Sequence, residues 1–175
     1  MPRRKKKRYN RPKKIFDKAV IQEEQDLIKK YGLKNRREVW KANFEIGKIR
    51  RIAKNLITAD EKKKEDFVMR QKEKGFPVEN LTDVLGLNKE DWLKRRLQNI
   101  VSKKGLASNP KQARQFITHR HVTINKRCIN SPAHLTTLNE EKNIILTLER
   151  PQKKEITEEE EEILNKIHVR EEKNE

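Results

Sequence analysis

The sequence has few of the residues from which disulfide-bonded, membrane and secreted proteins are built. Cysteine occurs once, at Cys128, so the chain can form no internal disulfide, and a reducing cytoplasmic setting is expected. No apolar run approaches the roughly 18 residues of a membrane span. The basic N-terminus leads into no apolar segment of the kind found in signal peptides. These absences favour a cytoplasmic protein with no membrane partner.

Residues that bind metals or carry out catalysis are also scarce. His119, His121, Cys128 and His134 are close in sequence, but their spacing matches no zinc motif, so no metal and no cofactor is expected. Cys128 is instead expected to be a small core residue. Outside residues 92–148 the chain is helical in pattern and charged, with no nucleophile and base at a usable spacing. The sequence therefore predicts a protein that is not an enzyme.

Positive charge is what the chain has in excess. Its net charge of +17 and pI near 10.0 indicate nucleic acid or an anionic membrane surface as the partner, and no lipidation motif supports the membrane. Residues 1–14 carry nine Lys or Arg side chains and no acid, which predicts a basic tail that orders on RNA. A tail that stays disordered, or a nuclear-import patch, fits the same residues. Residues 151–175 hold nine acids against five bases, which predicts an acidic tail.

The first half of the chain has the apolar period of helices. Helices are predicted over 17–31, ended by Gly32, over a longer segment opened by a capping box at Asn35-x-x-Glu38, and from Thr58 to about Lys74. Residues 80–87 are interpreted as a short apolar connector. The inner stripe of the second helix is formed by Val39, Ala42, Ile46, Ile49, Ala53 and Leu56. Its outer faces carry Arg37, Lys41, Lys48, Arg50, Arg51 and Lys54.

Residues 92–130 combine two short amphipathic helices with a strand and a turn. Leu93, Leu97, Ile100 and Val101 form one apolar stripe of the first helix, which ends at Gly105. Asn109 and Pro110 then begin a second helix as N-cap and N1, with Gln112 at N3 and with Ala113, Phe116 and Ile117 facing inward. The period changes to two over 121–125, which predicts a strand followed by a turn. A further alternating segment, residues 144–148, can close a small sheet.

The polar residues of this segment form predicted cationic faces that suit a folded polyanion. Cations can pair with phosphates, and amides and imidazoles can reach 2′-hydroxyls and base edges. A basic face that is merely solvated is the alternative for any single helix. With the cations of the second helix listed above, the predicted RNA-contacting residues are Arg95, Arg96, Gln98, Lys103, Asn109, Lys111, Gln112, Arg114, Gln115, His119, His121, Thr123, Asn125, Lys126 and Arg127.

Three short motifs in this segment resemble a known RNA-binding domain. Arg96-Leu97, the run from Ser108 to Gln115 and the run from His119 to Asn125 are similar to the domain named after the fourth small-subunit ribosomal protein (S-four). Gln98 stands where that domain often has Asp, Arg120 where it often has Gly, and Lys126 where the hairpin usually has Gly in Asn-Gly. The last change removes the residue best suited to positive φ.

The helical part carries a second resemblance. Residues 31–62 and 85–98 are similar to the helical region of the archaeal and eukaryotic branch of this ribosomal protein family. The resemblance implies a structural protein of the small ribosomal subunit that binds the subunit rRNA directly at a helical junction and promotes assembly and translation. It also implies neighbouring ribosomal proteins and a place beside the mRNA entry path.

The expected fold class is α+β, a mainly helical lobe joined to a small α/β RNA-binding domain. The expected division is a basic tail over 1–14, a helical rRNA-binding lobe over 15–90, the S-four-type domain over 91–150 and an acidic tail over 151–175. Two other functions remain open: an RNA-modifying enzyme or other non-ribosomal RNA-binding protein that uses the same domain, and a DNA-binding protein that places helix 110–119 in a major groove.

Overall fold

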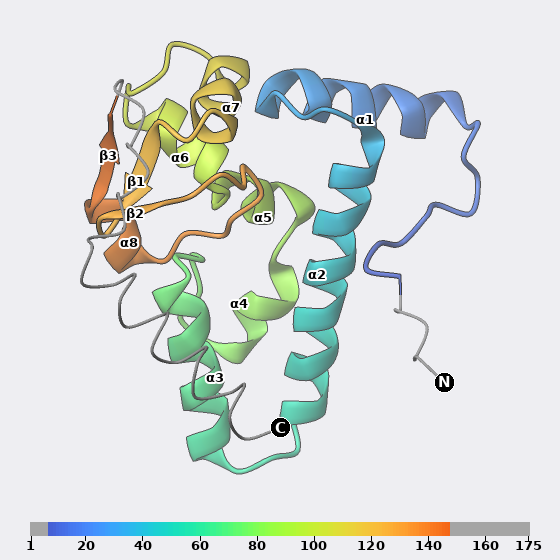
Figure 1. Cartoon of the computed structure of the whole chain (residues 1–175). Coiled ribbons are helices and arrows are strands. Elements are labelled where there is room, and N and C mark those ends of the chain that lie inside the picture. The colour runs from blue at the N-terminus through green and yellow to red at the C-terminus, as the bar shows by residue number, and fades with distance from the viewer. Residues whose placement is uncertain (1–6, 148–175) are drawn as a thin grey trace, which may run out of the picture.

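A computed structural model describes residues 7–147, which form a helical lobe and a small α/β lobe (Figure 1). The α+β fold class is confirmed. The helices are α1 Lys18–Tyr31, α2 Arg36–Leu56, α3 Glu61–Glu73, α4 Leu81–Gly86, α5 Lys89–Lys94, α6 Leu97–Lys103, α7 Pro110–Thr118 and α8 Leu138–Lys142. The strands are β1 Val122–Ile124, β2 Arg127–Cys128 and β3 Ile144–Leu146. No helix within residues 7–147 combines the length and apolar character needed to cross a membrane.

Helices α1 and α2 form the frame of the helical lobe and begin and end close to the predicted residues. Asp17 caps α1 by accepting a hydrogen bond from the Ala19 amide, and Gly32 ends it with a φ of 58°. The predicted inner stripe of α2 is buried except for Leu56, which is half-buried. The predicted capping box does not form, because Asn35 makes no side-chain cap and Glu38 accepts from the Lys34 amide instead.

The segment between α2 and α5 differs from its prediction at two points. Helix α3 is preceded by Asp60 as its N-cap, so the predicted start at Thr58 is wrong. The predicted connector is helix α4, which has a capping box between Asn80 and Asp83. A six-residue helix is too short to show an apolar period in sequence, but its Val84 is fully buried in one of the cores of this lobe.

The predicted helix that ends at Gly105 is two helices, α5 and α6, because the chain breaks at Arg95 and Arg96. Arg96 has an extended backbone (φ −70°, ψ 143°). The Leu97 amide, free at the start of α6, donates to the His134 carbonyl over 2.8 Å. A tertiary contact from the loop after β2 therefore replaces the helical hydrogen bond, which no local pattern could show. Gly105 ends α6 as predicted, with a φ of 73°.

The α/β lobe has one core, enclosed by α6, α7 and a three-stranded sheet of order β2-β1-β3. Both neighbours of β1 are antiparallel to it, with Ile124 opposite Arg127 on one side and opposite Ile144 on the other. Val122 and Ile124 point into the core, as the alternation predicted, and the strand from Ile144 closes the sheet. Phe116 is only half-buried at the edge of this core.

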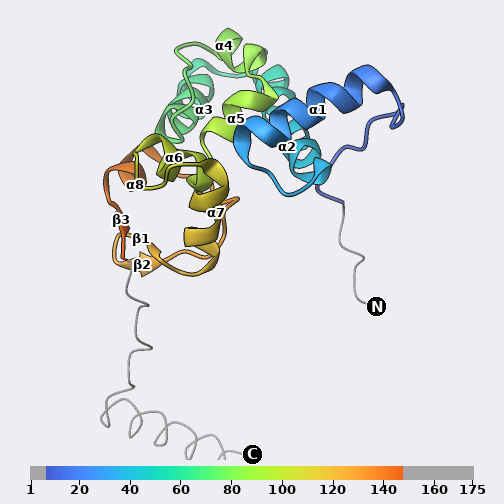
Figure 2. The ribbon, with the colours of Figure 1, turned by 90° about the horizontal axis from the view of Figure 1, so that it is seen from above.

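The two lobes lie side by side and meet along α5, as the view in Figure 2 shows. Leu93 of α5 packs with Leu27, Tyr31 and Val39 of the helical lobe, whereas Leu97 belongs to the core of the α/β lobe. The change of core falls at the break between α5 and α6. The polar residues at this break therefore lie between the lobes.

Candidate nucleic-acid interface

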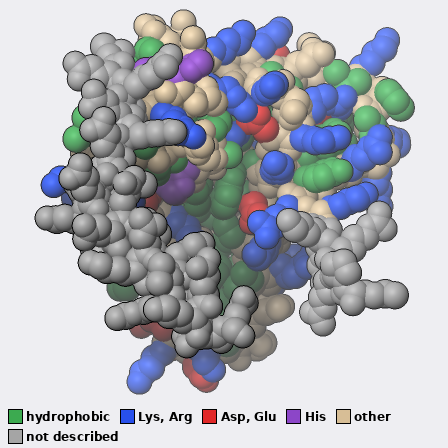
Figure 3. All heavy atoms as spheres, in the orientation of Figure 1, with side chains coloured by type: hydrophobic (Ala, Val, Ile, Leu, Met, Phe, Trp, Pro, Cys, Tyr) green, Lys and Arg blue, Asp and Glu red, His purple; other side chains and the backbone are tan. Residues whose placement is uncertain are grey.

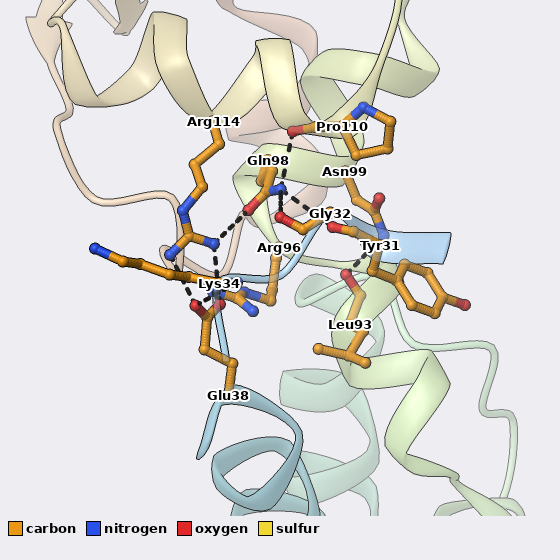
Figure 4. A network of polar contacts seen from close by, with 10 residues as sticks. All are labelled: Tyr31, Gly32, Lys34, Glu38, Leu93, Arg96, Gln98, Asn99, Pro110 and Arg114. Carbon is orange, nitrogen blue, oxygen red and sulfur yellow. Dashed lines mark hydrogen bonds and ion pairs between the residues drawn. The ribbon is translucent and has the colours of Figure 1, made fainter. Parts of the chain in front are cut away.

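A largely buried carboxylate, that of Glu38 at the start of α2, joins the two lobes by binding two arginines (Figure 4). Its Oε1 lies 2.7 Å from Nη2 of Arg114 on α7, and its Oε2 lies 2.7 Å from Nη2 of Arg96. Burial by itself raises the pKa of the Glu38 carboxyl, but the hydrogen bonds and charges of the two guanidinium groups outweigh it, so the pKa is lower than usual. Glu38 is therefore held as a carboxylate.

Gln98 extends this network to the end of α1. Its Nε2 donates toward the carbonyls of Tyr31 at 3.1 Å, Gly32 at 2.9 Å and Pro110 at 2.9 Å, while its Oε1 accepts from Arg114 at 3.2 Å. An Asp at this position would offer only acceptors to three carbonyls. The departure of Gln98 from the usual residue of the domain thus has a physical reason in this chain.

Gly32 allows the close approach on which these contacts depend. Its φ of 58° lies in the left-handed region, and a Cβ at this position would come within 2.9 Å of Pro110 Cβ and 3.0 Å of Gln98 Nε2. The C-terminus of α1 and the N-terminus of α7 can therefore touch only through a glycine.

Arg95, at the break between α5 and α6, points away from the Glu38 network and holds other segments together. Its Nε donates to the Lys74 carbonyl over 2.9 Å, its Nη1 lies 2.8 Å from Glu141 Oε2, and its Nη2 donates to the Thr136 carbonyl. The guanidinium group packs directly against Gly75, where an added Cβ would meet Arg95 Cζ at 2.4 Å. Arg95 thereby connects the end of α3 to α8.

The expectation that Arg95, Arg96, Gln98 and Arg114 lie on an exposed cationic face is therefore wrong. Arg96 and Gln98 are only 5% and 2% exposed, and each of the four side chains forms at least one hydrogen bond or ion pair inside the protein. Helical period places a residue on a face but does not show what packs against that face. Here the face is covered by α1, by the start of α2 and by the loop before α8.

Other predicted residues on α6 and α7 do lie at the surface. Lys103, Asn109, Lys111 and Gln115 are exposed, and neither lysine forms an ion pair within residues 7–147. Gln112 is half-buried, and its Oε1 accepts from the Ser108 amide over 2.9 Å.

The β1–β2 hairpin and the turn between α7 and β1 carry the rest of the predicted surface of the α/β lobe. Asn125, Lys126 and Arg127 of the hairpin and His119 of the turn are exposed, whereas Thr123 and His121 are half-buried. Of the half-buried pair, His121 has its Nδ1 3.2 Å from the Thr147 carbonyl and Thr123 donates to the Ile145 carbonyl.

Two residues that replace glycines of the domain keep the backbone that the glycines would have. The hairpin loop is Asn125-Lys126 with φ values of 50° and 65°, which is the type I′ geometry, and Arg120 has a φ of 65°. Lys126 therefore adopts the strained conformation rather than altering the turn.

The cations of α2 form a second exposed set. Arg37, Lys41, Lys48, Arg51 and Lys54 are exposed and form no ion pair within the described part of the chain. Arg50 differs, because it is half-buried and its Nη2 donates to the Leu87 carbonyl.

An aromatic contact that the sequence did not reveal holds the N-terminal segment against α2. The Tyr9 ring stacks on Trp40 with centroids 6.2 Å apart, and Arg37 lies over the Tyr9 ring at 5.9 Å. Trp40 Nε1 donates to Glu24 over 2.8 Å, and the same carboxylate binds Arg36. The basic residues from Lys7 onward therefore start beside the cations of α2.

The possible metal ligands noted in the sequence do not converge within the described residues, which contain no group of three or more His, Cys, Asp or Glu side chains placed to hold an ion. Cys128 is exposed, so the expectation that it is a core residue is wrong. His134 instead lies 3.4 Å from Glu140.

Comparison with known proteins gives matches that cover most of the chain. The S4 domain family matches residues 95–141. "Small ribosomal subunit protein uS4" of Methanosphaera stadtmanae is 41% identical over a 152-residue alignment that covers 82% of this chain and 82% of its own. The protein of the same name from Korarchaeum cryptofilum is 40% identical and covers 81% of this chain and 89% of its own. That from Methanothermobacter thermautotrophicus is 39% identical over 89% of this chain and 94% of its own.

Proposed function

Since this chain belongs to the family of small ribosomal subunit protein uS4, we propose that it is a structural component of the small ribosomal subunit that binds the subunit rRNA directly. Its partners are rRNA and neighbouring small-subunit proteins. An RNA-modifying enzyme, or a non-ribosomal protein with the same domain, is not favoured, because the similarity extends over the helical lobe as well as the S4 domain.

We further propose that the protein catalyses no reaction and that it binds where RNA helices converge, beside the path of mRNA. The observation that supports a junction is the arrangement of two exposed cationic sets on two lobes fixed to each other by the Glu38 network. One set is on α2, and the other is on α7 and the hairpin. Rigidly spaced cations can neutralise phosphates of two helices at once and so offset their repulsion.

The proposed RNA-contacting residues follow from exposure. They are Lys103, Asn109, Lys111, Gln115, His119, Asn125, Lys126 and Arg127 of the α/β lobe, with Gln112, His121 and Thr123 at its partly buried margin, and Arg37, Lys41, Lys48, Arg51 and Lys54 of α2. Arg50 is also proposed to face RNA, although its Nη2 donates to the Leu87 carbonyl.

The proposed units are the helical lobe over 15–90 and the RNA-binding domain over 91–150. The change of core between Leu93 and Leu97 supports a boundary close to this division. The basic tail over 1–14 is proposed to continue the cationic surface of α2. The acidic tail over 151–175 lies outside the described residues.

Competition binding tests the proposed function. The protein is titrated with a folded fragment of the small-subunit rRNA and with duplex DNA of equal length at several salt concentrations. We expect a preference for rRNA at matched salt and a steep loss of affinity with salt, with each neutralised phosphate contributing a slope of roughly −0.7 to −0.9 in log K against log salt. Equal affinity for both nucleic acids, or a flat salt dependence, would contradict the proposal.

A further inference from the structure

A groove of about 680 Å³ opens between α2 and the α/β lobe, directly beside the Glu38 network. One wall is formed by Lys34, Arg37 and Lys41 at the start of α2, and the opposite wall by Arg114 and by Pro132 and Ala133 of the loop after β2. Figure 3 shows hydrophobic side chains deep in the hollow between the lobes and Lys and Arg side chains along its margin.

The groove is electropositive although acids contribute to it. It is lined by six cationic side chains, Arg8, Lys34, Arg37, Lys41, Arg96 and Arg114, and by two acidic ones, Glu38 and Glu45. Glu38 is already shared by two guanidinium groups. Arg96 is nearly buried, and its Nε has no hydrogen-bond partner among the described residues. Its incompletely matched charge acts through a poorly solvated wall and so reinforces the attraction of an anion.

The same groove has an apolar lining that a phosphate chain alone would leave uncovered. Ala42, Trp92, Pro132 and Ala133 contribute to it, and Trp92 is held in place by stacking on Phe76 with centroids 5.9 Å apart. A duplex is too wide to enter a hollow of this size and can only rest on its rim. A planar ring with an attached phosphate matches both the apolar lining and the cationic margin.

We propose that this groove binds one unstacked nucleotide of the bound RNA, with the base inside and the flanking phosphates on Lys34, Arg37 and Lys41. The inference rests on the proposed function and extends it from a surface contact to a pocket. Proteins that recognise RNA commonly take up bases splayed out from loops and junctions, stacked on aromatic rings or guanidinium planes. Arg114 and the adjoining apolar residues that line the groove provide such surroundings without requiring a particular base.

Filling the groove while leaving every cation in place tests the proposal. Ala133 is exposed and lines the groove, so Ala133→Trp adds bulk there without disturbing a packed core. Ser131→Trp is the matched control, because Ser131 is an exposed residue of the same loop that does not line the groove. Ala133→Leu provides a smaller obstruction if circular dichroism shows that the tryptophan variant melts early.

The full-length parent and the three variants are titrated on the rRNA fragment, and the RNA in each complex is probed with base-modifying reagents. We expect Ala133→Trp to bind roughly tenfold more weakly, the loss of one stacked base, at an unchanged salt slope because no cation is removed. We expect one base to be protected by the parent and by Ser131→Trp and to react in the Ala133→Trp complex.

Parental affinity and an identical protection pattern in Ala133→Trp would overturn the pocket while leaving the proposed function intact. A parent protein that does not prefer rRNA over duplex DNA would overturn both, and this result is read from the parent alone. The two failures are therefore distinguishable.

Discussion

Arg114 and Arg127 are both basic residues of the α/β lobe, and their sequence surroundings gave them the same predicted role, yet the structure separates them. Arg114 binds a carboxylate 76 residues earlier in the chain and is mostly buried. Arg127 is exposed on β2 and forms no ion pair among residues 7–147. The difference lies in what packs against each residue. A guanidinium group serves the fold when a distant segment supplies its counter-charge, and it remains free for a ligand when none does.

The same contrast distinguishes two residues one turn apart on α7. Lys111 is exposed, whereas Arg114 reaches Glu38 and Gln98. Two basic residues three positions apart on one helix can therefore lie on different sides, one exposed and proposed to contact RNA, the other in the contact between the lobes. Reversing the charge of an arginine in the interlobe contact is therefore expected to lower stability, whereas reversing an exposed one is expected to lower RNA affinity.

The largest effect is expected when the charge of Arg114 is reversed. Arg114→Glu places a second carboxylate against Glu38 and leaves Arg96 as the only counter-charge, so we expect a loss of about 3 kcal/mol in the free energy of unfolding, as for a broken buried pair. Urea denaturation measures it. Arg127→Glu is the matched control and should stay within about 0.5 kcal/mol of the parent. Equal stability of the two variants would remove the distinction drawn between them.

Acidic pH should weaken the same network because it protonates the Glu38 carboxylate. The pKa of Glu38 in the folded protein is below its ordinary value of 4.5, so the folded state binds protons less readily than the unfolded one. The resulting stabilisation is present above about pH 4.5 and is lost as pH falls through the folded pKa.

Glu38→Gln isolates the contribution of Glu38, because Asp83, Glu90 and Glu140 also have lowered pKa values and add to the acid sensitivity of the parent. We expect the variant to be less stable near neutral pH and to lose less stability on acidification. Urea titrations at a series of pH values measure this difference. Parallel pH profiles for parent and variant would show that Glu38 is not stabilised as a carboxylate.

Reversing an exposed cation should act on binding alone. Arg127→Glu loses one phosphate contact and adds repulsion, so we expect affinity for rRNA to fall roughly tenfold, the equivalent of about 1.4 kcal/mol. Glu45→Lys changes the charge by the same amount in the opposite sense at a residue that lines the groove, and should not weaken binding. Filter binding measures both. Parental affinity for Arg127→Glu would place the hairpin outside the RNA interface.

The sequence predicted the elements whose cause is local and missed those whose cause is tertiary. Helix α1 is marked at both ends by Asp17 and Gly32, and the alternation around β1 showed which strand residues enter the core. The break before α6 depends on a carbonyl of the loop at His134, and the burial of Arg96 depends on Glu38. Neither partner is a neighbour in sequence, so no period or cap could indicate them.

The same distinction applies to the candidate site. The exposure of cations such as Lys111 could be predicted because an amphipathic period identifies a polar face, whereas their contact with RNA stays a prediction. The groove was not predicted, since its walls come from five separated segments, represented by Arg8, Lys41, Trp92, Arg114 and Ala133. The stacking of Tyr9 on Trp40 was also missed, and the only sequence signal was one aromatic residue within a basic run.

The smallest effect is expected at Lys126, where the contribution of the backbone conformation can be separated from that of the charge. Its φ of 65° places a side chain in the left-handed region, at a cost of roughly 1 to 2 kcal/mol, while its exposed ammonium group forms no ion pair within residues 7–147 and is proposed to contact RNA. Lys126→Gly relieves that strain but gives the unfolded chain more freedom, so a net gain of about 0.5 kcal/mol in the free energy of unfolding is expected. Lys126→Ala removes the same charge and keeps the Cβ, so it should show no such gain. Both variants should bind rRNA more weakly by a similar factor, because each loses one phosphate contact. Urea denaturation and filter binding on the two variants distinguish the effect of the backbone from that of the charge. An equal gain in stability in Lys126→Ala and Lys126→Gly would show that the gain comes from relieved charge repulsion in the hairpin and not from the turn conformation.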